Sequence, residues 1–174
     1  MQIEAEDYYK LYEQELQPKA YPIDRGETSL LAKSVANTLL SFLQGRDEKK
    51  AILIVRVNPI APCDDEGGAV VALDPPGGSM VKYIKGGVPS NVSDSVTKGE
   101  SFSAVIYNID PGAAISVKVT SPKCNQAAFP VEVGDVTYTG KNQKVEAGEV
   151  ISYMRVFLKD LGGSGDGGTD AGTD

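Results

Sequence analysis

The feature that most constrains the fold is a series of short apolar segments separated by turns rich in Gly, Pro and Asp. Ala51 to Val57 is a run of branched apolar residues, which is typical of a strand covered on both faces. Ile115 to Thr120 alternates apolar with polar residues, as a half-buried strand does. The other segments of this kind are Ala69 to Leu73, Met80 to Ile84, Phe102 to Ile109, Phe129 to Val133, Val136 to Thr139 and Glu149 to Lys159. Roughly seven short strands with this spacing predict a mainly β chain folded as an antiparallel, Ig-like β-sandwich.

The last of these segments predicts a strand with two distinct faces. One face carries Ile151, Tyr153, Arg155 and Phe157, and the other carries Val150, Ser152, Met154, Val156 and Leu158. Both faces are largely apolar, so we expect this strand to lie inside the domain.

The first 48 residues are expected to form two helices. From Ile3 to Leu16, apolar and aromatic residues recur at helical spacing, at Tyr8, Leu11, Tyr12 and Leu16. A second helix is expected to begin at a Thr28 or Ser29 cap and to stop at Gly45. Its apolar stripe consists of Leu31, Val35, Leu39 and Phe42. The predicted organisation is a helical docking segment over 1–48, a sandwich over 49–161 and an acidic tail over 162–174.

The tail from Gly162 to Asp174 has six Gly and three Asp among its thirteen residues. This composition cannot bury a core, so we expect the tail to be flexible in isolation.

The composition argues against several functional classes. The chain has no His and a formal net charge of −7, with a pI of about 4.7. The lack of His excludes Ser-His-Asp and Cys-His catalysis and every metal site that needs His. An acidic surface repels phosphate, so a nucleic-acid partner is not expected. The start has no signal-peptide pattern, and no apolar run approaches the roughly 18 residues that a membrane span requires. We therefore expect a protein that is not an enzyme and has no cofactor.

Two cysteines, Cys63 and Cys124, allow one disulfide. Without a secretion signal we expect two free thiols. The disulfide stays open as an alternative, because a virus particle released by lysis meets an oxidising environment later.

Two other motifs are candidates for a binding site. Asp64-Asp65-Glu66-Gly67 is the densest acidic cluster in the body of the chain, but it lacks the alternation of an EF-hand loop. We expect a solvated loop there rather than a cation site. The Gly pairs at 67–68, 77–78 and 86–87 do not precede Lys-Ser/Thr at the spacing of a phosphate loop, so we expect turns.

The N-terminal segment offers candidate interface residues. Tyr8, Tyr9 and Tyr12 are three tyrosines within five residues, accompanied by Leu11 and Leu16. Tyr suits interfaces because it combines apolar area with a polar tip, but packing against the second helix is an equal alternative. Met1 to Leu16 has five acidic residues and one Lys, a net charge of −4, so a basic partner surface would complement it.

The second half of the sandwich region resembles a known family. The residues concerned are Lys98-Gly99-Glu100-Ser101-Phe102, Asn108, Ala114-Ile115-Ser116-Val117-Lys118-Val119 and Ala147-Gly148-Glu149. Over Thr97 to Lys159 the chain resembles bacterial Ig-like domains of the cell-adhesion type. Its layout of helices followed by an Ig-like part also resembles head decoration proteins of tailed phages, in which the helical part binds the capsid lattice. It departs from these families in lacking a signal peptide and a long Pro-rich linker.

These observations predict a structural protein of a large assembly. The layout implies a phage virion component, either a capsid decoration protein or an accessory head or tail protein. It would dock onto capsid or tail proteins through its N-terminal helices and be lattice-bound or homo-oligomeric. One alternative is an exported filament or adhesin subunit at the cell surface. Another is a carbohydrate-binding module using Tyr83, Tyr107 or Tyr138, although the chain has no Trp.

Overall fold

The computed structural model describes residues 2–3, 6–19, 32–112, 114–148 and 150–160. Strands make up 46% of it and helices 6%, so the prediction of a mainly β fold is confirmed. The one helix among the described residues is α1 (Lys33–Leu40). The strands are β1 (Gln2–Ile3), β2 (Lys10–Glu13), β3 (Leu16–Pro18), β4 (Ala51–Pro59), β5 (Val70–Asp74), β6 (Met80–Lys85), β7 (Val88–Pro89), β8 (Ala104–Ile109), β9 (Ala114–Thr120), β10 (Cys124–Gln126), β11 (Val131–Val133), β12 (Val136–Tyr138), β13 (Gln143–Lys144) and β14 (Val150–Asp160).

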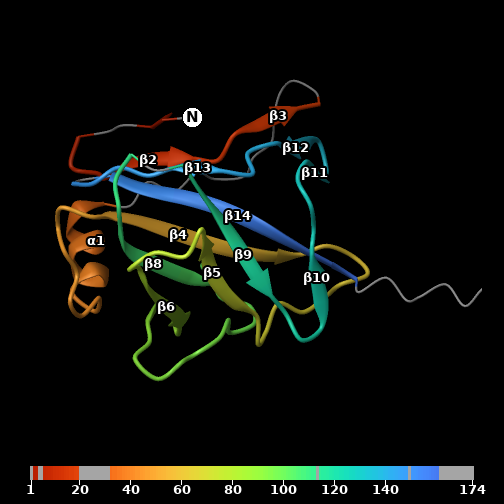
Figure 1. The fold of residues 1–174 in the computed structure, drawn as a ribbon, viewed down its shortest axis with the longest axis horizontal. Coiled ribbons are helices and arrows are strands. Elements are labelled where there is room, and N and C mark those ends of the chain that lie inside the picture. The colour runs from red at the N-terminus through yellow and green to blue at the C-terminus, as the bar shows by residue number, and fades with distance from the viewer. Residues whose placement is uncertain (1, 4–5, 20–31, 113, 149, 161–174) are drawn as a thin grey trace, which may run out of the picture.

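The largest sheet is mixed rather than antiparallel. Its strand order is β1-β2-β14-β4-β8-β6-β7, and β10 also pairs with β14. Strand β14 is parallel to both β2 and β4, whereas the other pairs are antiparallel. The predicted purely antiparallel arrangement is therefore wrong, because β14 returns from the far end of the chain to lie between two early strands. Two smaller sheets have the orders β11-β12-β3 and β13-β9-β5 (Figure 1).

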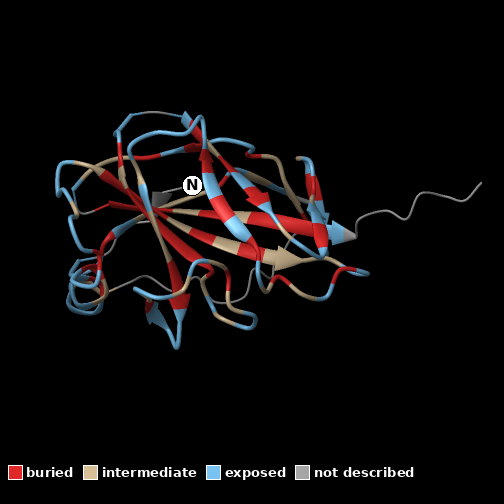
Figure 2. Cartoon of the chain, turned by 60° about the horizontal axis from the view of Figure 1, so that its bottom comes forward, coloured by how far each residue is buried: buried red, intermediate tan, exposed pale blue. Residues whose placement is uncertain are grey.

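The main core lies between the large sheet and the β13-β9-β5 sheet, in a β-sandwich-like arrangement. Val55 of β4 and Met154 of β14 share this core with Val71 of β5 and Val117 of β9. Along β9 the buried residues alternate with half-buried or exposed ones, as the sequence pattern predicted. Along β14, Met154, Val156 and Leu158 are buried in this core, whereas Ile151 and Phe157 are buried in other clusters, so the predicted division into two faces is confirmed. Figure 2 shows that buried residues predominate along the long strands of the domain.

The other face of the large sheet holds a second core beneath α1. Ala36, Leu40 and Leu43 from the helix region pack with Ile52 of β4 and Ile151 of β14. Tyr9, Ile84, Val105 and Tyr107 complete the buried cluster. Strand β4 is thus covered on both faces, as its run of branched residues predicted.

The predicted helix from Ile3 to Leu16 is wrong, because the structure forms short strands there. Leu11 of β2 lies opposite Ile151 of β14, and Leu16 of β3 lies opposite Tyr138 of β12. Pairing with these distant strands satisfies the backbone groups, and this tertiary effect overrides a local spacing that also fits a helix.

The second helix is shorter than predicted, and it faces the core differently. It begins after Ala32, which makes no side-chain capping hydrogen bond. The predicted cap residues Thr28 and Ser29, together with Leu31 and the tail over 162–174, lie outside the described residues. The predicted apolar stripe is not the buried face, because Val35 is 51% exposed and Phe42 is 40% exposed.

Two glutamine side chains complete strand pairing where no strand is available. Gln126 of β10 donates from Nε2 to the carbonyl of Val117 at 2.9 Å and accepts at Oε1 from the amide of Val119 at 2.7 Å. Buried Gln14 donates to the carbonyl of Gly140 at 2.5 Å and accepts from the amide of Arg155 at 3.0 Å. Each carboxamide thus takes the place of a peptide group from a neighbouring strand.

Asn108 forms a β-bulge that fastens the loop after α1. Ala51 pairs with Ile109 and Ile52 with Tyr107, which leaves Asn108 as the extra residue of β8. Its φ of 61° is a left-handed conformation that Asn tolerates better than most residues. Its side chain donates to the carbonyl of Gly45 at 2.9 Å and accepts from the amide of Asp47 at 2.8 Å.

Substitution of Asn108 separates these two roles. Asn108→Gly keeps the left-handed conformation and loses the hydrogen bonds, so we expect it to lower the free energy of unfolding by about 1 kcal/mol. Asn108→Ala also adds backbone strain, so we expect a loss of about 3 kcal/mol. Urea unfolding followed by circular dichroism measures both, and an Ala variant as stable as the Gly variant would contradict the bulge assignment.

The shared core also predicts that residues 1–48 are needed for folding. Deleting them removes β2 from the edge of β14 and uncovers Ile52, Tyr107 and Ile151. We expect the fragment 49–174 to lose cooperative thermal unfolding and to bind a hydrophobic dye. A fragment that unfolds as cooperatively as the full chain would show instead that the sandwich region is independent.

Candidate protein-interaction surface

The outward side of α1 carries a strip of apolar residues among uncharged polar ones. Val35, Leu39 and Phe42 lie along it at helical spacing and are exposed or half-buried; we call these three residues the α1 strip. From Lys33 to Phe42 the only charged residue is Lys33, in a chain of which 24% is charged. Exposed apolar residues grouped in this way are more typical of a contact surface than of a solvated helix.

The contacts beneath the strip hold the helix in place. The hydroxyl of Tyr9 donates to Oδ1 of Asn37 at 3.0 Å, and the amide of Lys33 donates to the carbonyl of Asp7 at 2.9 Å. At the C-terminal end of the helix, a recess of about 540 Å³ is lined by Asn37, Leu40, Ser41, Leu43, Gly45, Arg46 and Glu48. The strip is therefore presented by a packed element rather than by a loose one.

The structure separates the N-terminal residues predicted to form an interface. Tyr9 is buried in the core beneath α1, and Tyr12 donates from its hydroxyl to Oε2 of Glu146 at 3.2 Å. Leu11 and Leu16 are half-buried in strands. Tyr8 is 39% exposed and forms an isolated bridge with Ala32, next to the start of α1. Of the three tyrosines, Tyr8 is therefore the one left open to a partner.

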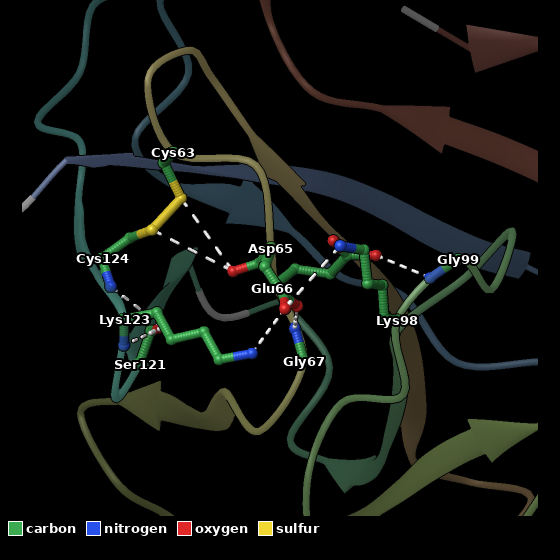
Figure 3. A network of polar contacts seen from close by, with 9 residues as sticks. All are labelled: Cys63, Asp65, Glu66, Gly67, Lys98, Gly99, Ser121, Lys123 and Cys124. Atoms are coloured by element: carbon green, nitrogen blue, oxygen red, sulfur yellow. Dashed lines mark hydrogen bonds and ion pairs between the residues drawn. A yellow bond between two sulfur atoms is a disulfide. The ribbon is translucent and has the colours of Figure 1, made fainter.

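Cys63 and Cys124 form a disulfide, which corrects the expectation of free thiols. The bond joins the loop after β4 to the start of β10, across 61 positions of sequence (Figure 3). Both residues are buried, and they belong to the main core. The sequence alone could not show that these two positions meet, because their proximity depends on the pairing of β10 with β14.

The acidic cluster beside the disulfide is a structural crosslink. The carboxylate of Asp65 contacts the ammonium group of Lys123 closely, lies 3.7 Å from that of Lys98 and accepts from the amide of Gly67 at 2.8 Å (Figure 3). The hydrogen bond from Lys123, followed by that from Gly67, lowers the pKa of Asp65 below its usual value. Buried Glu66 accepts from the amide of Gly99 at 2.8 Å.

These contacts correct the prediction of a solvated loop, which fits only Asp64, the exposed acidic residue of the three. Within the described part of the chain, no group of three or more His, Cys, Asp or Glu residues is arranged to hold a metal ion.

Two of the three tyrosines considered for sugar stacking are buried. Tyr107 donates from its hydroxyl to the carbonyl of Gln44 at 3.0 Å, and the hydroxyl of Tyr83 accepts from the amide of Val71 at 2.9 Å. Tyr138 is half-buried and packs against the ring of Phe157. Tyr83 and Tyr107 have no free ring face to offer a sugar, which weakens the carbohydrate-binding alternative.

The outer edge of β5 is also protected. The amide of Gly68 donates to the carbonyl of Val96, and the amide of Val96 donates to the carbonyl of Ala69, both at 2.9 Å. The bond from Val71 to Tyr83 covers the next outward-facing amide. Such protection opposes the addition of a strand from another chain at this edge.

Comparison of the chain with protein-family models, curated proteins and solved structures gives no match. None of the helices in the described residues is long and apolar enough to cross a membrane.

The disulfide is expected to contribute strongly to stability. Closing a loop of this length removes unfolded-chain entropy worth about 4 kcal/mol in the loop model. We therefore expect the Cys63→Ser, Cys124→Ser double variant to unfold at a clearly lower urea concentration than the oxidised chain. A phosphine reductant should lower the midpoint of the native chain and leave that of the variant unchanged. Thiol titration that finds two free thiols in the native protein would contradict the bond.

Proposed function

We propose that this protein is a non-enzymatic structural component of a large assembly, and that the assembly is a phage particle, in which it serves as a capsid decoration or accessory head or tail protein. The observation that carries the proposal is the exposed α1 strip beside Tyr8. This surface revises the docking site expected from the sequence, because the first predicted helix is absent and Tyr9 is buried.

The composition of the surface indicates the kind of partner it fits. Val35 and Phe42 are apolar, and Tyr8 adds an aromatic ring with a polar tip. Glu6 and Asp7 are exposed immediately before Tyr8. A complementary partner would present an apolar patch bordered by Lys or Arg. A protein of the particle shell is proposed as that partner.

A second candidate function is favoured by the disulfide. Disulfides persist in oxidising environments, which include the cell surface as well as a released particle. An exported filament or adhesin subunit is therefore the alternative. The protected edge of β5 counts against assembly by strand addition at that edge.

Fractionation of the native host tests the proposal. We expect the tagged full-length chain to co-migrate with phage particles on a density gradient after lysis. Recovery in the cell-surface fraction, with none in the particles, would contradict the virion assignment and support the alternative.

Substitutions in the α1 strip test the docking surface itself. Val35→Ser with Phe42→Ser removes apolar area that an interface would bury, so we expect the amount bound per particle to fall about tenfold or more. Val92→Ser is the matched control, because Val92 is 88% exposed and lies away from α1 in the sequence. Circular dichroism confirms that each variant is folded. A double variant that binds like the control would exclude the strip as the docking surface.

A further inference from the structure

Two arginines lie side by side on the outer face of the large sheet. Arg155 of β14 pairs in register with Arg56 of β4, so both side chains leave the same face of neighbouring parallel strands. Among the described residues, neither guanidinium lies within ion-pair distance of a carboxylate, although the chain as a whole has a net charge of −7. Like charges placed directly opposite across a sheet repel each other. Within the described part of the chain, the pair therefore has no carboxylate at ion-pair distance to balance its charge.

Two aromatic rings lie beside Arg155. The guanidinium carbon of Arg155 lies 5.9 Å from the ring centre of Tyr138 and 5.7 Å from that of Tyr153. Phe102 packs edge-on against Tyr153 at 6.1 Å. We call Arg56, Arg155, Tyr138, Tyr153 and Phe102 the arginine platform, and all five residues are half-buried.

The surroundings hold the platform in a fixed geometry. The amide of Arg155 donates to Gln14, and Tyr138 packs on Phe157, which is buried in a separate small core. Burial raises the pKa of the Tyr153 hydroxyl, while the nearby charges of Arg155 and Arg56 oppose that rise. A guanidinium that lies over aromatic rings, as that of Arg155 does, can still bind a carboxylate through its edge with two parallel hydrogen bonds.

We propose that the arginine platform is a binding site for carboxylates, and that its occupant is the acidic tail of this chain, Gly162 to Asp174. The proposal is independent of the proposed function, because the arginine platform and the α1 strip share no residue, although both lie on the side of the large sheet that α1 covers in part. Binding would place carboxylates beside Arg56 and Arg155.

The position and length of the tail support this choice. The tail follows β14 and carries Asp166, Asp170 and Asp174. Arg155 lies five residues before Asp160, or about 17 Å back along the strand. The six residues from 161 to 166 span at most about 20 Å when extended, which is barely enough for Asp166, whereas Asp170 reaches the platform with slack for a path around the covered Phe157.

Tethering also favours the tail over a separate acidic partner. A tethered segment is present at an effective concentration in the millimolar range, and it does not have to approach an acidic protein from solution. A foreign acidic peptide would instead have to overcome repulsion by the net charge of −7. The tail would thereby compete with any other carboxylate that enters the site.

Nuclear magnetic resonance on the full chain provides the test. We expect the side-chain Nε–H signals of Arg56 and Arg155 to differ between the native chain and the full-length variant with Asp166→Asn, Asp170→Asn and Asp174→Asn. The difference should shrink in high salt, because screening weakens the contact. A synthetic peptide of residues 162–174, added to this variant, should restore the native signals in a saturable manner. The same peptide with Asn in place of its three Asp residues should not restore them.

Single substitutions at the platform locate the binding. In the triple-Asn background, Arg155→Gln and Arg56→Gln should each weaken peptide binding about tenfold or more, and Arg155→Lys should weaken it less. Lys118→Gln is the matched control for charge, because Lys118 is exposed on β9, and it should leave binding nearly unchanged. A backbone fingerprint spectrum verifies that each variant is folded. If an Arg→Gln variant is unfolded, peptide binding is measured on Arg155→Lys, which keeps the charge. Weaker binding to this variant than to the triple-Asn chain then supports the site, and equal binding contradicts it.

Three results would overturn the proposal. Identical arginine signals in the native chain and the triple-Asn variant would show that the tail does not occupy the platform, even if the added peptide binds. Failure of the added peptide to bind would exclude the carboxylate site. Equal weakening by Lys118→Gln would show that the peptide responds only to net charge.

Discussion

The fold depends on β14, which must be buried on both faces and paired along both edges. One face lies in the main core and the other lies partly beneath α1. Strand β4 covers one edge over seven register positions, from Ser152 to Leu158. The other edge is shared, because β2 pairs with its start and β10 pairs with its end. The N-terminal segment, the helix and the disulfide-linked strand β10 are all arranged around this one strand.

Side chains complete the pairing where backbone cannot. Gln14 fills the gap between β2 and β10 on the edge of β14, and Gln126 pairs with β9. A carboxamide has one donor group and one acceptor group, which matches a peptide unit. Because a buried backbone group without a partner costs roughly 1–3 kcal/mol, these two glutamines allow short strands to end inside the domain. The hydroxyl of Tyr83 has a similar role at the edge of β5.

The sequence was informative where the pattern has a period of two and uninformative where partners are distant. The strands near Ala51, Ile115 and Val150 were predictable, because alternation and branched residues favour extended chain whichever strand lies beside it. The segment from Ile3 to Leu16 was not, because spacings of three and four also occur in short strands and only pairing with β14 decides between them. The pairing of distant strands also determines which residues meet at the arginine platform and at the disulfide. Nothing in the sequence indicates that Arg56 lies opposite Arg155, or that Cys63 meets Cys124.

The parallel pairing of β2 with β14 has a consequence for biosynthesis. Leu11 lies opposite Ile151, a partner that the ribosome adds 140 residues later. At about 5–20 residues per second, the early strand waits roughly 7–28 seconds for that partner. Throughout this interval Tyr9 and Leu11 lack Ile151, so the nascent chain exposes apolar surface that the finished protein buries. The order in which this polypeptide is made therefore leaves the edge of β2 that pairs with β14 without its partner until translation is nearly complete.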